Sequence, residues 1–285
     1  MPRGSLALTG VTGQLGAKVL ARFAARRAPA VLLARNPSKV ASTPGFEVRA
    51  CDYADAQGAR RALEGVDTLL MVSGAETPDR VAQHTAFIDA AGSAGVQHLV
   101  YTSFFGAAPD AAFTLARDHW VTEEHLRASG LAHTVLRDNL YADFLPMMTV
   151  DGAIRGPAGE GRVAAVAQDD IADVIVAVLD QPEEHVGETY DLTGPQALTL
   201  AEVAKVITEV TGRHTVYVPE SPEEAYASRA SYGAPDWQVD AWVSTYTAIA
   251  EGELDGVADA VPRLTGHPAT SLRELLVRAG QAGSR

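Results

Sequence analysis

The stretch that decides the fold runs from residue 5 to residue 27 and reads "SLALTGVTGQLGAKVLARFAARR". A short apolar run leads into Gly10, Gly13 and Gly16, and a helix-like segment follows directly. Glycine at these positions lets the chain turn sharply, lets a phosphate approach the backbone and lets the strand and the helix pack closely. The spacing is G-x-x-G-x-x-G. It predicts either a helix N-terminus that faces the phosphates of a nucleotide or a tight turn without a ligand.

The pattern around this loop continues along the chain. Leu15, Val19 and Phe23 recur at helical spacing and predict one buried stripe on the first helix. Short apolar runs then alternate with helix-like stretches to about residue 140. Apolar strands separated by helices are typical of a parallel sheet covered on both faces, because a parallel strand needs a crossover to rejoin its neighbour. We therefore predict an α/β fold with a doubly wound parallel sheet.

After about residue 145 the alternation loosens into a glycine-rich stretch and further helices and strands. One of these helices is predicted to be capped by Thr199 and ended by Gly212. We predict a nucleotide-binding domain over residues 1–145 and a smaller α+β, substrate-binding lobe over residues 146–285. Some strands and helices of the second part are allowed to return to the first domain.

Composition excludes several classes of protein. The net charge of −13 would repel a phosphate backbone, so nucleic acid is not an expected partner. Cys51 is the single cysteine, which excludes an internal disulfide and a multi-cysteine metal site. No stretch approaches the length of a membrane span, and the N-terminus does not resemble a signal peptide. We expect a cytoplasmic protein, a monomer or homodimer, without membrane attachment and without a metal.

The end of the second predicted strand bears on the choice of dinucleotide. It reads "LARNPSK" over residues 33–39, so Arg35 stands where NAD-specific proteins carry an acid for the ribose 2′-hydroxyl, and Asn36 and Lys39 follow. A guanidinium binds a 2′-phosphate through charge-assisted hydrogen bonds. This favours NADPH over NADH, the other interpretation being a solvated surface arginine. Asp52, after the third strand, either meets the adenine edge or serves an ordinary turn.

These motifs, in this order, resemble the atypical short-chain dehydrogenase/reductases. The branch is the NmrA-like one, which includes NAD(P)H:quinone oxidoreductase type 2 and triphenylmethane reductase. The resemblance covers almost the whole chain. It rests on "TGVTGQLG", "LARNPSK", "HLVYTSF", "HWVTEEHLRASGLAHTVLRDNLY", "GETYDLTGPQALTLAEVAKVITEVTGR" and "RLTGHPATSLRELL".

The resemblance implies a Rossmann-like domain with a smaller C-terminal lobe, NADPH as cofactor and a substrate cleft between them. Some members of this family bind the dinucleotide without turning anything over. The cofactor contacts that follow are Thr9, Gly10, Thr12, Gly13, Gln14, Leu15, Gly16, Arg35, Asn36, Lys39, Asp52, Ser73, Gly74, Thr102, Ser103 and His119.

The usual acid of the superfamily is missing. Typical members carry a Tyr-x-x-x-Lys pair on the helix that here contains "xxxExxLxxSGL". With Glu123 as the glutamate of that pattern, the lysine position is His119 and the tyrosine position is Leu115. Ser103 matches the serine at the end of the fifth strand. The resemblance therefore assigns catalytic roles to Ser103 and His119, and we add Tyr141 to them.

The loss of the tyrosine points to a class of acceptor. A positioned general acid contributes about 10² to 10⁴ in rate, and reduction of a simple ketone generates a strongly basic alkoxide. A quinone gives a phenolate-like anion whose conjugate acid has a pKa of about 10, and a cationic triarylmethane is simply neutralised by hydride. We therefore expect a conjugated or electron-poor acceptor.

Two histidines lie on this helix. His119 is open to two interpretations: contact with the cofactor or substrate, including proton donation, or packing against the sheet. His125 is six residues later and faces elsewhere on a helix, so the two do not form a metal pair.

Aromatic and polar residues follow the fifth and sixth predicted strands, where open α/β sheets bind ligands. Together they suit contact with a flat apolar ring of a substrate, although packing in the hydrophobic core explains each single residue equally well. The predicted substrate contacts are Phe104, Phe105, Asn139, Tyr141 and Phe144.

The main hypothesis is an NADPH-dependent, quinone reductase-like oxidoreductase acting on a small conjugated or aromatic acceptor. Two alternatives remain. One is a non-catalytic NADP(H)-binding redox sensor or regulator, and the other is a tailoring reductase of secondary metabolism that acts on an aromatic ketone or imine.

Overall fold

The computed structural model describes residues 5–282. The chain forms two compact units, each built from three segments. The first unit comprises Met1–Ser103, Asp118–Arg137 and Ile171–Tyr190, and the second comprises Phe104–Arg117, Asp138–Asp170 and Asp191–Arg285. The units therefore interleave, while the predicted division at residue 145, with strands and helices allowed to return to the first domain, stays a prediction. The chain leaves the first unit after Ser103 and again after Arg137, and it returns at Asp118 and at Ile171.

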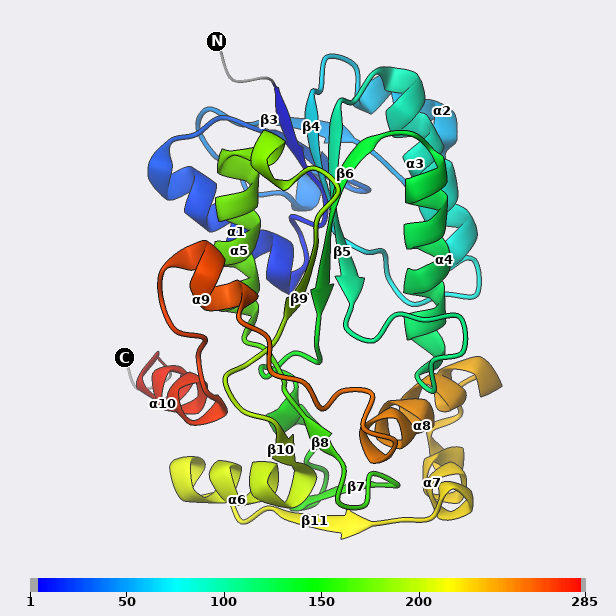
Figure 1. The fold of residues 1–285 in the computed structure, drawn as a ribbon, viewed down its shortest axis with the longest axis vertical. Coiled ribbons are helices and arrows are strands. Elements are labelled where there is room, and N and C mark those ends of the chain that lie inside the picture. The colour runs from blue at the N-terminus through cyan, green and yellow to red at the C-terminus, as the bar shows by residue number, and fades with distance from the viewer. Residues whose placement is uncertain (1–4, 283–285) are drawn as a thin grey trace. The chain divides into compact units, whose positions relative to one another are not determined.

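A seven-stranded sheet organises the first unit (Figure 1). Its order, with β1 between β2 and β4, is that of a Rossmann-like fold. The pairs formed by β1 with β2, β1 with β4, β2 with β3 and β4 with β5 are parallel. The prediction of a doubly wound parallel sheet is confirmed. In spatial order the strands are β3 (Glu47–Ala50), β2 (Val31–Ala34), β1 (Leu6–Leu8), β4 (Thr68–Met71), β5 (His98–Phe104), β6 (Ala132–Asp138) and β9 (Thr189–Leu192).

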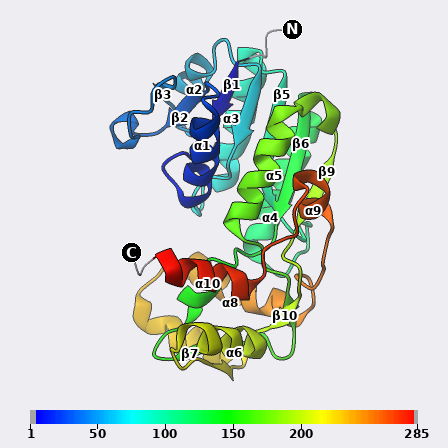
Figure 2. The same ribbon diagram turned by 90° about the vertical axis from the view of Figure 1, so that its left-hand side faces the viewer.

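Helices cover both faces of this sheet (Figure 1). One face carries α1 (Gln14–Arg26) and α5 (Gln168–Asp180), which lie next to each other in Figure 2 and are joined by an Arg22–Asp173 ion pair of 2.6 Å. The other face carries α2 (Ala56–Ala62), α3 (Arg80–Ala94) and α4 (Thr114–Ala128).

Burial follows the sequence pattern. The predicted stripe of Leu15, Val19 and Phe23 is the buried side of α1. Phe87 of α3 and Leu126 of α4 belong, with strand residues, to one hydrophobic core. Removal of these apolar side chains from water is the main force that holds the layers together.

The second unit has two small sheets and several helices. In one sheet β7 (Ala153–Gly156) pairs with β11 (Val216–Pro219), and in the other β8 (Arg162–Val163) pairs with β10 (Leu198–Thr199). The helices are α6 (Leu200–Thr211), α7 (Pro222–Arg229), α8 (Asp236–Ala250), α9 (Ala260–Thr265) and α10 (Leu272–Ala282). The described part of the chain also contains four 3₁₀ turns: η1 (Pro37–Lys39), η2 (Leu145–Met148), η3 (Pro182–His185) and η4 (Ala230–Tyr232).

The ends of α6 were predictable. Thr199 caps it with a capping box to Glu202, and Gly212 ends it in the left-handed conformation with φ of 72°. The same kind of signal, Ser221 with Glu224, begins α7, which the sequence analysis missed.

Within residues 5–282, none of the helices combines the length and the hydrophobicity needed to cross a bilayer.

Candidate functional site

The glycine loop between β1 and α1 has the backbone geometry of a phosphate cradle. Gly10 has a φ of +68°, and a Cβ atom on Gly16 would lie 2.1 Å from the carbonyl oxygen of Gly10. Gly13 is the N-cap of α1, and no described side chain caps this helix end or places an acid in its first turn. The first N–H groups of α1 therefore have an anion as their natural partner. The loop fits a pyrophosphate.

Three loops at the same edge of the sheet are tied together through Thr9. The N–H group of Val72 donates to the Thr9 hydroxyl at 2.9 Å, and the Tyr53 hydroxyl lies 2.7 Å from that oxygen and 2.8 Å from the carbonyl of Val72. Tyr53 also stacks on Phe87, with ring centroids 4.1 Å apart. These contacts fix the loops after β1, β3 and β4 at the point where the strand order reverses, which is where such sheets bind ligands. Tyr53 was missed by the sequence analysis.

Arg35 is exposed at the end of β2 and lines a hollow of about 450 Å³. Two further arginines line it, of which Arg49 is already bonded to Glu47 and to two backbone carbonyls. Asp52 also lies on its wall. The cationic side of the hollow suits a phosphate. The other lining residues are Ala50, Cys51, Asp55, Gly58, Arg61 and Ala62.

Three other predicted cofactor residues lie in a local helix cap, a 3₁₀ turn or a turn of the chain. Asn36 accepts hydrogen bonds from the N–H and the hydroxyl of Ser38 and so caps η1, to which Lys39 belongs. Asp52 accepts from the N–H of Ala54 at 3.0 Å, which is the turn role considered for it. Their contact with a dinucleotide stays a prediction.

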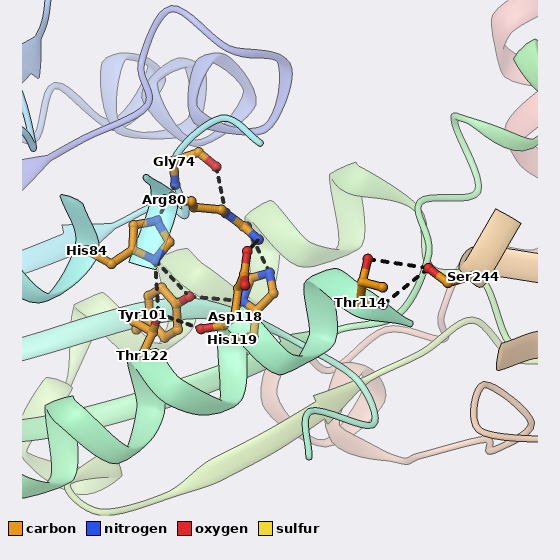
Figure 3. A network of polar contacts seen from close by, with 9 residues as sticks. All are labelled: Gly74, Arg80, His84, Tyr101, Thr114, Asp118, His119, Thr122 and Ser244. Atoms are coloured by element: carbon orange, nitrogen blue, oxygen red, sulfur yellow. Dashed lines mark hydrogen bonds and ion pairs between the residues drawn. The ribbon is translucent and has the colours of Figure 1, made fainter. Parts of the chain in front are cut away.

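The loop after β4 is held by side chains of α3 (Figure 3). The N–H group of Gly74 donates to Nε2 of His84 at 2.8 Å, and Nε of Arg80 donates to the Gly74 carbonyl at 3.2 Å. Next to it, the N–H of Ser73 donates to the hydroxyl of Thr102 at 2.9 Å. Both backbone groups of Gly74 are thus satisfied by α3. Ser73, Gly74 and Thr102 were predicted to contact the cofactor, whereas Arg80 and His84 were not found from sequence.

His119 lies between Arg80 and Tyr101 and is almost fully buried (Figure 3). Its Nε2 is 2.9 Å from a guanidinium nitrogen of Arg80 and its Nδ1 is 2.9 Å from the Tyr101 hydroxyl. A guanidinium only donates, so Nε2 accepts and Nδ1 carries the hydrogen. Burial, and then the charge of Arg80, lower the pKa of His119 well below its ordinary value. The ring is therefore neutral.

His84 is neutral for the same reasons. Burial and the charge of Arg80 lower its pKa to about 3. Its Nδ1 lies 3.1 Å from the hydroxyl of Thr122 on α4. The two rings and the guanidinium form one hydrogen-bonded group in the first unit.

The predicted catalytic Ser103 has a partner inside the protein. Its hydroxyl donates to a carboxylate oxygen of Glu123 at 2.6 Å, and Arg137 and Arg127 donate to the same, fully buried, carboxylate. Glu123, which marks the family register, is thus the centre of an ion cluster. A bond from Ser103 to a substrate would have to replace this one.

The position at which the resemblance predicts the loss of the usual tyrosine is apolar. Leu115 is buried in the hydrophobic core of the second unit. His125 pairs with Asp89 at 2.8 Å, so its side chain has a partner other than His119.

The predicted substrate residues belong to the second unit and differ in their surroundings. Phe104 belongs to the hydrophobic core and packs on Phe113, with ring centroids 4.9 Å apart. The side chain of Phe144, in contrast, is 48 % exposed. Asn139 is buried, donates to the Leu254 carbonyl and accepts from an adjacent N–H. The remaining two are Phe105, partly buried against the core, and Tyr141, which is half-buried.

The fold and the glycine loop define a dinucleotide-binding protein of the doubly wound class. A model of the NAD(P)H-binding family matches residues 10–182, and the chain belongs to this family.

Full-length relatives agree with this assignment. The chain is 34 % identical to quinone oxidoreductase 2 of Escherichia coli over 278 residues, which cover 94 % of this chain and 96 % of the relative. It resembles the structure of NADPH-dependent quinone oxidoreductase from Escherichia coli complexed with NADPH, with a TM-score of 0.87, 33 % identity and coverage of 96 % and 99 %. It also resembles triphenylmethane reductase from Citrobacter sp. complexed with NADP(H), with a TM-score of 0.85, 33 % identity and the same coverage.

Proposed function

We propose that this protein is an NADPH-dependent oxidoreductase that passes hydride to a quinone-like or other conjugated, electron-poor small molecule. The observation that carries the proposal is a contrast within one chain. The glycine loop has the backbone geometry that a dinucleotide needs, whereas the position that we assign to the usual acid is occupied by the core residue Leu115.

The chain's own residues account for binding and orientation. N–H groups at the start of α1 hold the pyrophosphate, and Arg35 neutralises the 2′-phosphate. The loop of Ser73 and Gly74, fixed by α3, lines the dinucleotide. When bound, NADPH supplies a hydride from its nicotinamide ring. Orientation of the acceptor against that ring then supplies most of the rate.

The protonation states of the two histidines favour an acceptor that needs no proton from either ring. His119 and His84 are neutral, and both nitrogens of each ring lie within hydrogen-bond distance of a partner. A neutral imidazole is a poor acid at neutral pH. Relatives that bear the names quinone oxidoreductase and triphenylmethane reductase support the same class of acceptor.

The test is oxidation of NADPH by the purified protein with a panel of acceptors. Saturable turnover of quinones or cationic dyes is expected, with little or none of a simple aliphatic ketone. Turnover of the aliphatic ketone alone would contradict the proposal.

A second candidate, an NADP(H)-binding redox sensor, is favoured by the same lack of an acid at Leu115. It predicts saturable binding of NADPH without turnover of any acceptor. The two candidates therefore separate in the same experiment.

A further inference from the structure

Asp138 is a buried carboxyl group at the end of β6. It is 2 % exposed, and its backbone carbonyl accepts a hydrogen bond from the N–H of Phe105 at 2.9 Å. Ligands of open α/β sheets bind outside the carboxyl ends of strands. Nothing in the sequence analysis singled this residue out.

The side chain of Asp138 has fewer hydrogen-bond partners among the described residues than a buried carboxylate needs. Its Oδ2 lies 3.4 Å from the hydroxyl of Tyr141, and its buried Oδ1 has no hydrogen-bond partner among the described residues. Buried ionised groups are paired with a cation or fully hydrogen-bonded, and buried polar atoms without a partner call for a ligand, a water or another explanation. Burial raises the pKa of Asp138 well above its ordinary value. Burial therefore favours the protonated form of this carboxyl group.

The proton changes what Tyr141 can do. An ionised Asp138 could only accept, and would draw the phenol hydrogen of Tyr141 toward itself. A protonated Asp138 can donate to the Tyr141 oxygen, so that the phenol hydrogen is left for another acceptor. Tyr141 is the residue of the second unit that we predict to contact the substrate through a hydroxyl group.

We propose that Asp138, in its acid form, is the proton source that acts through Tyr141 in place of the acid missing at Leu115. The inference rests on the proposed function and adds the proton to it. Hydride adds to the acceptor and leaves negative charge on its conjugated oxygen. The O–H bond of Tyr141 then breaks as the product O–H bond forms, and the proton of Asp138 restores the phenol. Asp138 is left as a carboxylate, which takes a proton from solvent before the next turnover.

Asp138 is thus a positioning and proton-relay residue rather than one that touches the acceptor. This role explains why a carboxyl group with one unpartnered oxygen is kept in the interior. It also makes the acid form necessary, because a carboxylate has no proton to relay.

The first test is infrared spectroscopy at neutral pH and does not depend on turnover. The difference spectrum between wild type and Asp138→Asn should contain the carbonyl stretch of a protonated carboxyl group. Asp151→Asn, at an exposed aspartate outside the site, is the matched control and should lack this band. If the difference spectrum for Asp138→Asn also lacks this band, the proposal is overturned.

The second test is kinetic. Asp138→Asn and Tyr141→Phe should each slow quinone reduction by about 10²-fold, within the range of general acid catalysis, with the NADPH dissociation constant unchanged. Because the two residues act in series, the double variant should be no slower than Tyr141→Phe alone. Losses that multiply, or full activity of Asp138→Asn, would overturn the relay.

Failure of the proposed function would look different. A wild-type protein that binds NADPH and reduces no acceptor overturns both the reductase and the relay, even where the infrared band is present.

Discussion

Arg80 brings a positive charge into the interior of the first unit, where it is 5 % exposed. His84 and His119 share this interior, and burial first and then the charge of Arg80 lower the pKa of each ring, so both are neutral. Arg80 thus adds to the effect of burial on two rings, and it also holds the loop predicted to line the dinucleotide through its hydrogen bond to Gly74.

This arrangement predicts a dependence of stability on pH. The pKa of His84 falls from 6.5 to about 3 on folding, so between these values the unfolded chain binds a proton that the native state does not. Stability is full above the upper value and is lost as the pH falls, by about 1.4 kcal/mol per pH unit for one proton. In His84→Asn the slope of the unfolding free energy against pH should fall by this amount.

Chemical denaturation at a series of pH values measures that slope. His214→Asn, at an exposed histidine, removes a ring without removing a buried one and should leave the slope unchanged. An unaltered slope in His84→Asn would show that the ring is not held neutral.

Arg35 carries the prediction of cofactor choice. A charge-assisted hydrogen bond contributes about 1.5 to 3 kcal/mol, so Arg35→Ala should weaken NADPH binding by about 10- to 100-fold. NADH has no 2′-phosphate, and its binding should change little. Fluorescence titration with both dinucleotides measures this.

Arg60→Ala is the matched control, since it removes an exposed arginine of α2 that does not line the hollow. Equal weakening of NADPH and NADH binding in Arg35→Ala would contradict the assignment of Arg35 to the 2′-phosphate.

Residues differ in how far the sequence predicts them. Gly10, Gly13 and Gly16 could be found because their role depends on the backbone of one short loop. Tyr53 and Arg80 could not, since their contacts join positions 44 and 39 residues apart in the chain. Such contacts depend on the order of the strands, which a local pattern does not contain.

At the scale of elements, β1, the glycine loop and α1 act as one unit of structure. A Cβ on Gly16 would lie 2.1 Å from the oxygen of Gly10 and 2.4 Å from its carbonyl carbon, and these are backbone atoms rather than the end of a flexible side chain. Gly16→Ala should therefore lower the free energy of unfolding by about 1 to 3 kcal/mol, as overpacking does, and abolish tight binding of NADPH.

Gly92→Ala provides the control for this substitution. Gly92 lies inside α3, and a Cβ there meets nothing within 4 Å. Alanine should stabilise that helix by about 0.5 to 1 kcal/mol and leave NADPH binding intact. Thermal unfolding and titration of both variants separate the loop from a general effect of alanine. Normal NADPH binding by Gly16→Ala would contradict the cradle.

Elements with strong local signals were predicted well. The helix α6 has a capping residue at one end and glycine at the other, and both ends were found. The two-residue strands β8 and β10 carry almost no periodicity and exist only through pairing with each other. Sequence patterns therefore could not find them.

For the molecule as a whole, the sequence predicts the class of fold and allows strands and helices of the second part to return to the first domain, but it does not say which ones. Strand alternation indicates a doubly wound sheet wherever it occurs. It does not show that Phe104–Arg117 leaves the first unit or that Ile171–Tyr190 returns to it. That course depends on which apolar faces pack together, and many segments offer such faces.

We propose that the bound dinucleotide gives its hydride to a conjugated acceptor. The most direct measurement uses NADPH carrying deuterium at C4 in one or the other configuration, with a cationic triarylmethane dye as acceptor. Mass spectrometry of the reduced dye reports the label, because the new carbon–hydrogen bond does not exchange with water. We predict that deuterium appears in the dye from one of the two labelled cofactors and not from the other. Saturable binding of NADPH with no label transferred from either labelled cofactor would contradict direct hydride transfer to such an acceptor.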